Sequence, residues 1–483
     1  MYTGEETPRW ESLATAAVVL YLVGRLGFLA FMVDPSLPPD EISHVGQARS
    51  QIDHWGMPRD SPASYEHGLV SHRPFLNTWL MARWLALQPA PVAAHVWLRL
   101  ANVAIALGTL AATLAWSRRA GARPGDRVLV ALLLTNLPMW SFLSASVNYD
   151  NLAMFFATVA FALLARYLDT RSPVSLAGFF LALTAGVLTK SAMLPLAALL
   201  TVGLVVSGRG SVLLDARALL RAPFARGPAV AALLAACLLS ALLAGALYGG
   251  NWARFGVLEP AAHQVLPIEA ARQNRIFQQE HVLRSYRAGA IDERQAVMEL
   301  QEIDHLGDRA GALWMLRRAS AMRRGEGPAP VGRLAYSAVW TPLMAERLFG
   351  VMGHRELYKS GGWAFAYALL AGLSLTVLAL RLRTANQHVR IGTCVAIGYA
   401  AILMQLVNYP IYLTTGLEVE AVQGRYLFPV LAPLLASAVL VNAASLPRPL
   451  RLPVGLAVAV FFVAGDFPYL MSQAEPAWWG LAS

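Results

Sequence analysis

The chain has 483 residues, of which 57% are hydrophobic and only 14% are charged. Soluble domains carry roughly a quarter charged residues, so this composition excludes an ordinary soluble protein and indicates an integral membrane protein. The formal net charge of +10 does not indicate nucleic-acid binding, because no basic stripe or base-reading motif accompanies it. Cys237 and Cys394 fall within apolar segments, where they are expected to serve as small packing residues.

Apolar stretches long enough to cross a bilayer recur along nearly the whole sequence. The first, at 13–33, is longer than the apolar core of a signal peptide and ends in Pro-Pro-Asp-Glu without a small-residue cleavage site, so we expect a retained helix. The sequence predicts an all-α integral membrane protein of about eleven transmembrane helices. Their expected ranges are 13–33, 93–116, 128–146, 150–168, 173–189, 192–206, 229–248, 363–380, 391–413, 426–443 and 453–472.

The distribution of basic residues predicts the orientation of these helices. With a cytoplasmic N-terminus, the cytoplasmic links hold most arginines, whereas the opposite links hold few cations beyond Lys190 and Arg425. This orientation places two long polar segments, 34–92 and 249–362, on the outer face. We therefore expect an N-terminal transmembrane module (1–248) that includes the outer loop 34–92, an outer helical cap (249–362) and C-terminal transmembrane helices (363–483).

The first outer loop begins with "PSLPPDEISHVGQ" (35–47), which contains Asp40, Glu41 and His44. If a helix begins near Pro38, the two carboxylates lie near its positive end and all three side chains project towards one side. A solvated charge cluster at the membrane surface is the ordinary alternative. Further along, 73–88 carries apolar residues and tryptophans at helical spacing, which predicts a helix lying on the membrane.

Three more polar groups are predicted at the same face. Each has an ordinary interpretation: helix capping for 146–154, a snorkelling lysine for 188–195 and an aromatic membrane anchor for 418–431. Together with the acidic outer loop they form a pattern of carboxylates and isolated cations that suits phosphate binding and general-base catalysis. The residues concerned are Asn148, Asp150 and Asn151; Lys190; and Glu418, Glu420, Gln423, Arg425 and Tyr426.

The segment 249–362 predicts charged helices followed by an aromatic stretch. It contains no Walker loop, no Gly-x-Gly-x-x-Gly and no Cys-x-x-Cys pattern, so nothing in it indicates a nucleotide site or a structural zinc site. We expect a small helical cap and not an independent catalytic domain.

Several motifs resemble those of the GT-C superfamily of membrane glycosyltransferases. They are "PPDEISHVGQARS", "SHRPFL", "SVNYDNLA", "FGVMGH" and "QGRYLFPVLAPLL", in this order between about residues 35 and 435. They are most similar to an uncharacterised bacterial branch related to the protein O-mannosyltransferases and the lipid A aminoarabinose transferase. The second motif departs from the family pattern, because Phe75 follows Pro74 where a second proline is usual.

The resemblance implies roles for individual residues. An acidic residue of the first outer loop is the catalytic base in this superfamily, which implies Asp40 as base with Glu41 orienting the acceptor or binding a metal. It also implies donor-phosphate binding by Arg425, with Gln423 and Tyr426. We assign Lys190 to the same phosphate by its position. Substrate binding is expected from His44, His72, Arg73, Asn148 and Asp150.

The implied reaction is inverting transfer of a sugar from a polyprenyl-phosphate donor to a hydroxyl of a glycan, lipid or protein acceptor. It would occur on the outer face of a bacterial inner membrane, among membrane lipids and without nucleic acid. No cofactor is required by the sequence; some relatives use a divalent cation, for which Asp40, Glu41 and His44 would be the ligands. A flippase or transporter of lipid-linked saccharides and a non-catalytic membrane scaffold are the alternatives, although no inverted repeat is visible.

Overall fold

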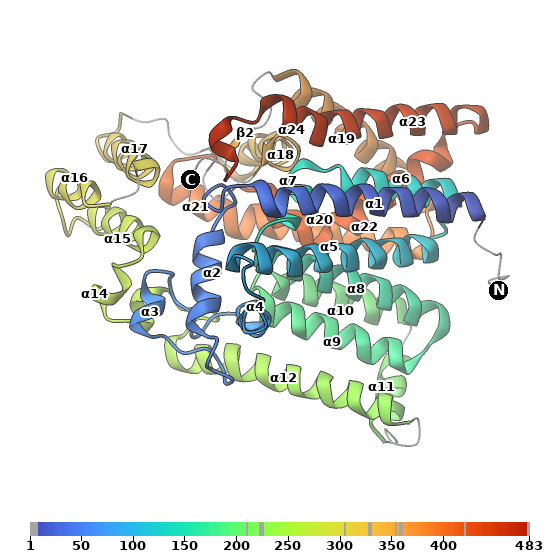
Figure 1. Cartoon of the computed structure of the whole chain (residues 1–483), viewed down its shortest axis with the longest axis horizontal. Coiled ribbons are helices and arrows are strands. Elements are labelled where there is room, and N and C mark those ends of the chain that lie inside the picture. Colours follow the sequence, from blue (N-terminus) through green and yellow to red (C-terminus); the bar gives the residue numbers. More distant parts are fainter. Residues whose placement is uncertain are drawn as a thin grey trace.

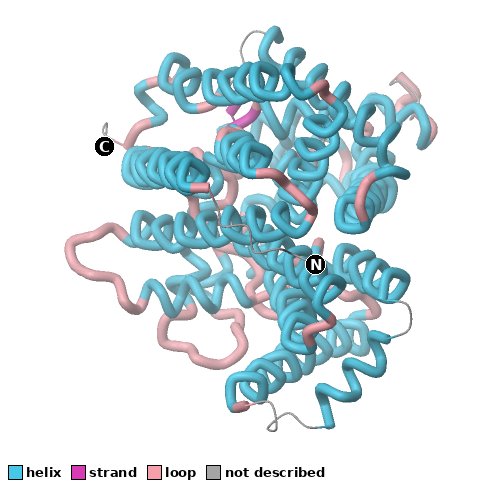
Figure 2. Tube along the Cα trace, turned by 90° about the vertical axis from the view of Figure 1, so that its right-hand side faces the viewer, coloured by secondary structure: helices cyan, strands magenta, loops and turns pink. Residues whose placement is uncertain are grey.

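The computed structural model describes residues 8–480 except 209–210, 222–226, 304–305, 327–330, 353–354, 357–360 and 420–421. Glu420 and the last two residues of "FGVMGH" therefore lie outside the described residues. The described chain is mainly helical (Figure 2). Its two short strands, β1 (Val351–Met352) and β2 (Arg355–Glu356), pair with each other in an antiparallel hairpin.

Eight helical segments of the described chain are long and apolar enough to cross a membrane, which confirms a multi-pass, all-α membrane protein. Five of them consist of α1 (Arg9–Met32), α5 (Ala94–Arg119), α8 (Tyr149–Thr170), α12 (Pro228–Phe255), and α19 (Gly361–Arg381) with η2 (Leu382–Thr384). The other three combine α20 (Gln387–Ile402) with η3 (Leu403–Asn408) and α21 (Tyr409–Thr415), η4 (Gly424–Leu427) with α22 (Phe428–Ser445), and α23 (Arg448–Gly465) with α24 (Phe467–Gln473).

The number of spans differs from the expected eleven. Two bent helix pairs raise the count in the described chain to ten if each pair is one span. They are α6 (Pro124–Thr135) with α7 (Pro138–Ser144), bent by 72°, and α10 (Met193–Gly208) with the start of α11 (Ser211–Arg221), bent by 104°. The helix α9 (Pro173–Thr189) is apolar but has only 17 residues, which is at the lower limit for a span.

The two long polar segments lie at one end of the bundle, opposite the N-terminus (Figure 1). We call this end the cap end. The first segment forms α2 (Glu41–Ser50), α3 (Pro62–Tyr65) and α4 (Leu76–Leu85). The second forms α13 (Ala262–Val265), α14 (Ile268–Ala271), α15 (Arg275–Arg287), α16 (Glu293–Gln301), α17 (Leu306–Arg323) and α18 (Arg333–Phe349). The last span leads back to this end, where η5 (Pro476–Trp478) follows α24.

The helix expected at 73–88 is confirmed as α4. Figure 1 views α4 along its axis, so it runs across the direction of the spans. Trp84 at its end stacks on Trp97 of α5, with ring centroids 4.8 Å apart. Each indole N–H donates to the other residue's carbonyl oxygen, at 3.0 and 2.8 Å. This paired contact fixes α4 to the start of a span.

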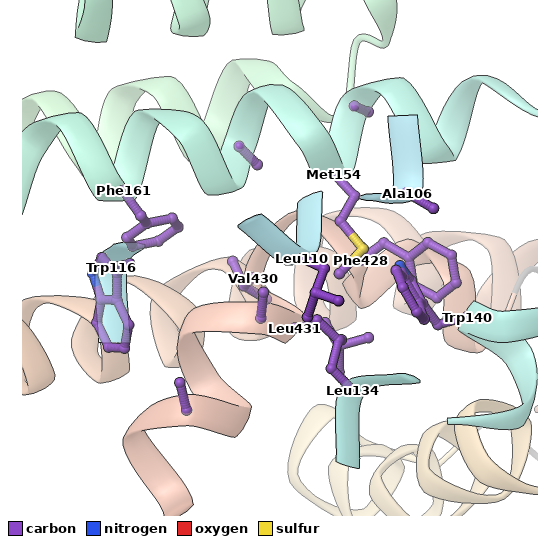
Figure 3. Close-up of a cluster of buried hydrophobic side chains, with 14 of the residues drawn as sticks. Ala106, Leu110, Trp116, Leu134, Trp140, Met154, Phe161, Phe428, Val430 and Leu431 are labelled. Carbon is purple, nitrogen blue, oxygen red and sulfur yellow. The ribbon is translucent and has the colours of Figure 1, made fainter. Parts of the chain in front are cut away.

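The apolar centre of the bundle lies between α5, α8 and α22, and α6 and α7 close one side (Figure 3). Trp140 and Phe428 meet there and are both almost fully buried. Small residues on α8, such as Ala153 and Ala157, have no exposed surface and allow the close approach that membrane helices use in place of a hydrophobic driving force.

The break between α6 and α7 contains a buried ion pair. Pro138 cannot continue the hydrogen-bond ladder, so carbonyl groups of the preceding turn need other partners. Arg25 of α1 donates to the carbonyl oxygen of Thr135, to Asn136 Oδ1 at 3.1 Å, and to the carboxylate of Asp466 between α23 and α24. The expected straight span 128–146 is therefore two helices whose junction is closed by the first and last spans.

Candidate active site

Four charged side chains from distant parts of the chain meet at the cap end of the bundle. We call Asp40, Asp150, Lys190 and Arg425 the central cluster. Arg425 Nη2 lies 2.9 Å from Asp40 Oδ2, and Arg425 Nε lies 3.7 Å from Asp150 Oδ2. Lys190 Nζ forms an ion pair with Asp150 Oδ1. Two carboxylates and two cations thus balance their charges in a largely desolvated space.

The start of α2 determines where the two acidic residues of the first loop point. The helix begins at Glu41, and Asp40 is its N-cap in the left-handed region, with φ of 62°. The carbonyl oxygen of Asp40 accepts from the His44 N–H at 2.9 Å. Because Asp40 precedes the first residue of the helix, its side chain turns towards Arg425, and it is 31% exposed.

Glu41 points to the opposite side and occupies a different environment from the expected one. Its carboxylate accepts from Arg99 Nε at 2.9 Å and Nη2 at 2.5 Å, and from the Val147 N–H at 2.7 Å. Glu41 and Arg99 have no exposed side-chain surface. Both carboxylate oxygens of Glu41 accept from protein donors and the side chain is fully buried, so Glu41 positions the loop and does not face a substrate.

Asn148 and Asp150 begin α8. Asn148 is the N-cap, and its Oδ1 accepts from the Asp150 N–H at 2.8 Å, as the sequence indicated for a capped helix start. Its Nδ2 donates to the carbonyl oxygen of Pro39 at 3.4 Å. Asn148 therefore ties the loop that carries Asp40 to the helix that carries Asp150.

Lys190 ends α9 in extended backbone conformation, with φ of −154°. Its Nζ lies 4.8 Å from the ring centroid of Tyr149 and 4.8 Å from that of Tyr426. Two aromatic faces and one carboxylate replace the hydration of the ammonium group. The arrangement differs from a lysine snorkelling to water, because the side chain is only 12% exposed.

Arg425 lies in η4, pressed against the cap helix α18. A Cβ atom on the preceding residue, Gly424, would lie 2.5 Å from the Cα of Leu348, so the close approach requires glycine. The Arg425 side chain is 5% exposed, yet its Nε and Nη1 have no hydrogen-bond partner among the described residues. Two buried guanidinium donors are thus available to ligand oxygens. Because Nε and Nη1 lie on different edges of the guanidinium, a two-oxygen contact would pair one of them with Nη2, which Asp40 now occupies.

His44 completes the wall of the cluster. Its ring meets the Tyr149 ring edge-on at 4.7 Å, and its Nε2 is buried without a partner in the described chain. Burial lowers the pKa of His44; Asp40 and Asp150 raise it, whereas Arg425 and Lys190 lower it further. His44 is therefore neutral at pH 7 and can accept or donate one hydrogen bond through Nε2.

Two of the expected binding residues, His72 and Arg73, have other surroundings, and a third, Gln423, shows no side-chain cap bond. His72 Nδ1 lies 2.9 Å from Asn251 Oδ1, and the His72 ring packs on Phe255 of α12. Arg73 pairs with Glu259. Gln423 is the N-cap of η4 without a side-chain cap bond.

The expected metal ligands do not assemble. Asp40 and His44 lie at the central cluster, but both oxygens of Glu41 are bound by Arg99. Within the described ranges, no group of three His, Cys, Asp or Glu side chains is arranged to hold a metal ion.

Two residues of this region were not singled out from the sequence. Arg99 is fully buried and also donates to the carbonyl oxygens of Ala30 and Val33, at 3.0 and 2.7 Å. A lone arginine inside an apolar span was the available signal. Tyr149 gave none, because only its contacts with Lys190 and His44 in the folded chain distinguish it from other aromatic residues.

Neither a family model nor a curated protein sequence matches the chain. Solved structures are similar to it in fold. ArnT from Cupriavidus metallidurans is 15% identical in the apo state, with TM-score 0.39, and 16% identical when bound to undecaprenyl phosphate, with TM-score 0.37; each match covers 90% of this chain and 78% of ArnT. The apo oligosaccharyltransferase of Archaeoglobus fulgidus is 14% identical, with TM-score 0.48, over 98% of this chain and 56% of that protein.

Proposed function

We propose that this protein is a GT-C-type glycosyltransferase that moves a sugar from a polyprenyl-phosphate donor to an acceptor hydroxyl. The observation that carries the proposal is the state of Arg425. Two nitrogens of its buried guanidinium have no hydrogen-bond partner among the described residues, and the group lies beside a second buried cation and a partly exposed carboxylate. A base and a phosphate site side by side are what such a transfer needs.

The donor phosphate is assigned to Arg425 and Lys190. A phosphate presents oxygens to the guanidinium fork, whereas Lys190 supplies a point charge. The cluster is already neutral, so an entering phosphate must compete with the carboxylates. Asp40 is the weaker competitor, because its side chain is 31% exposed and Asp150 is only 1% exposed. Donor binding therefore displaces Asp40 from Arg425.

This exchange prepares the base. While Asp40 is paired with Arg425, one of its carboxylate oxygens accepts from the guanidinium and does not face the acceptor hydroxyl. Once the phosphate has taken Arg425, the Asp40 carboxylate accepts a proton from the acceptor hydroxyl. The donor consequently binds before a productive acceptor.

The transfer itself is a single displacement. Asp40 takes the proton of the acceptor hydroxyl, whose oxygen forms a bond to the anomeric carbon while the bond from that carbon to the phosphate oxygen breaks. The electron pair leaves with the polyprenyl phosphate, whose added charge is stabilised by Arg425 and Lys190. One displacement inverts the anomeric configuration.

The same proposal includes an orientation. Arginine-rich links favour the cytoplasmic side for the end of the bundle that carries the N-terminus, which leaves the cap end on the outer face of a bacterial inner membrane. The donor enters from the outer leaflet, and the helices of the expected cap, 249–362, select a glycan, lipid or protein acceptor.

The decisive experiment uses purified protein in lipid nanodiscs with radiolabelled polyprenyl-phosphate sugars. Donor binding and slow donor hydrolysis are measured for the wild type, Asp40→Asn, Arg425→Gln and a surface control, Arg294→Gln. We expect Arg425→Gln to lose binding, and Asp40→Asn to bind donor without turnover. If the wild-type protein binds no such donor, the glycosyltransferase proposal is wrong and a transporter or scaffold function is favoured. Full turnover by Asp40→Asn would exclude Asp40 as the base.

A further inference from the structure

A second cavity, away from the central cluster, lies between the cap end of α12 and the first loop. Its volume is about 610 Å³. One wall comes from α12 and includes Leu247, Gly250 and Arg254, and the other comes from the loop and includes Arg59 and His72. His72, which was expected to bind a substrate, thus lines this cavity and not the central cluster.

On the side of the first loop, the position of His72 in the cavity wall is fixed by hydrogen bonds. The backbone of His72 is left-handed, with φ of 57°, a conformation that non-glycine residues rarely adopt without a structural reason. Asn251 of α12 holds it: its Oδ1 lies 2.9 Å from His72 Nδ1, and its Nδ2 donates to the His72 carbonyl oxygen at 2.9 Å. With Nδ1 engaged, Nε2 is the ring nitrogen left for a ligand.

The two arginines of the cavity have no neutralising partner among the described residues. The nearest carboxylate along the chain from Arg59 is Asp60, which accepts from the N–H groups of Val70 and Ser71 and from the Ser71 hydroxyl. Glu259 pairs with Arg73. Both local acids are thus occupied, and the guanidinium groups of Arg59 and Arg254 give the cavity a positive potential.

The rest of the surroundings is apolar and faces the membrane. Ala246, Leu247 and Ala253 line the α12 side of the cavity. Further along α12, Leu238, Leu239 and Leu242 are more than half exposed, as is Trp252 at the cap end. Exposed leucines mark a lipid-facing helix, and an exposed tryptophan near its end marks the headgroup level.

We propose that this cavity binds the phosphate headgroup of a membrane amphiphile, whose chains run along α12. A cationic pocket at headgroup depth with an apolar flank suits a lipid phosphate better than a free anion. The site is independent of the glycosyl-transfer proposal and supplies a second lipid contact besides the donor phosphate of the central cluster.

The test uses delipidated protein in maltoside detergent and native mass spectrometry, with dioleoyl phosphatidic acid as the probe. Dioleoylglycerol has the same chains without phosphate, and inorganic phosphate lacks the chains. Gly250→Leu fills the cavity without changing its charge, since an added Cβ meets nothing within 4 Å. Gly249→Leu is the matched control: the added Cβ also meets nothing within 4 Å, and Gly249 does not line the cavity.

We expect Gly250→Leu and Arg59→Gln/Arg254→Gln to bind one phosphatidic acid fewer per protein, with an affinity for the lost lipid at least about tenfold lower. Gly249→Leu and the charge control Arg294→Gln should match the wild type. Equal binding of dioleoylglycerol, displacement of the lipid by inorganic phosphate, or identical behaviour of the two glycine variants would overturn the proposal. Loss of the same lipid in Arg425→Gln would show that the lipid binds at the central cluster and not in this cavity.

Discussion

Arg425 and Asp40 form an ion pair with a distance of 2.9 Å across 385 residues of sequence. The two residues have unequal surroundings: the arginine side chain is 5% exposed and the carboxylate 31%. In the proposed mechanism an incoming phosphate opens this pair from the more exposed carboxylate side, and the arginine stays in place. Three of the following predictions concern how these two residues are held.

Asp40→Asn removes the proton acceptor and keeps the shape of the side chain. We expect transfer to fall by roughly two to four decades, with donor affinity unchanged or slightly higher because the amide competes less strongly for Arg425. Product formation and donor binding are measured on the same preparation. Asp53→Asn, an exposed change in the same loop, should leave both unaffected.

Arg425→Lys preserves the charge but not the fork of donors. Since the proposed phosphate contact uses two guanidinium nitrogens, we expect donor affinity to fall by about tenfold or more. Equilibrium binding of a labelled polyprenyl-phosphate sugar checks this. Undiminished affinity would show that a point charge suffices and would assign the phosphate mainly to Lys190.

Gly424→Ala tests the contact that positions Arg425. The added Cβ would overlap the backbone of Leu348, so α18 and η4 must separate, at a cost of about 1–3 kcal/mol in unfolding free energy. We expect weaker donor binding although no charge has changed. Gly372→Ala, where a Cβ meets nothing within 4 Å, is the control, and thermal unfolding in detergent gives the stability difference.

Arg99→Met leaves the Glu41 carboxylate buried without its counterion. The expected loss is about 3–5 kcal/mol of unfolding free energy. Arg99→Met with Glu41→Leu should recover part of this loss, because the unpaired charge is then gone. The half-exposed pair Arg119–Asp169 is the comparison, and Arg119→Met should cost less than about 1 kcal/mol. A double-mutant cycle that gives no coupling between residues 99 and 41 would contradict the proposed positioning role.

Protein stability should fall on mild acidification because of His44. Burial lowers its pKa from the ordinary 6.5, so below about pH 6.5 the unfolded chain binds a proton that the folded protein does not, and unfolding is favoured as pH falls. The slope reaches at most about 1.4 kcal/mol per pH unit for one group. Thermal unfolding between pH 7.5 and 5 measures it, and His44→Phe, which keeps a ring against Tyr149, should flatten the dependence.

Part of the site was predictable because charges in apolar surroundings are costly and therefore informative. Lys190, Arg425 and Asp150 were identified in this way and meet in the structure. The distinction between Asp40 and Glu41 depends on the first residue of α2, and sequence patterns do not give helix starts to a single residue. The environments of His72 and Arg73 depend on Asn251 and Glu259, which lie 179 and 186 residues away.

In the fold, too, some features were predictable from local sequence and others depend on residues far away in the chain. Apolar length predicted a multi-pass helical protein and the position of most spans. The interruption of 128–146 had a local signal in Pro138, but its stabilisation depends on Arg25 and Asp466, on the first and last spans. Periodicity and hydropathy are local quantities and do not report such a partner.

The pairing of Arg25 with Asp466 also has a consequence for biosynthesis. Arg25 enters the membrane with the first span, and its carboxylate partner is translated 441 residues later. Throughout synthesis the charge lies in an apolar helix without its counterion, a state that is costly in lipid. A chain that stops before Asp466 keeps this charge without its carboxylate, so its first span is expected to be held less firmly in the bundle than in the full chain.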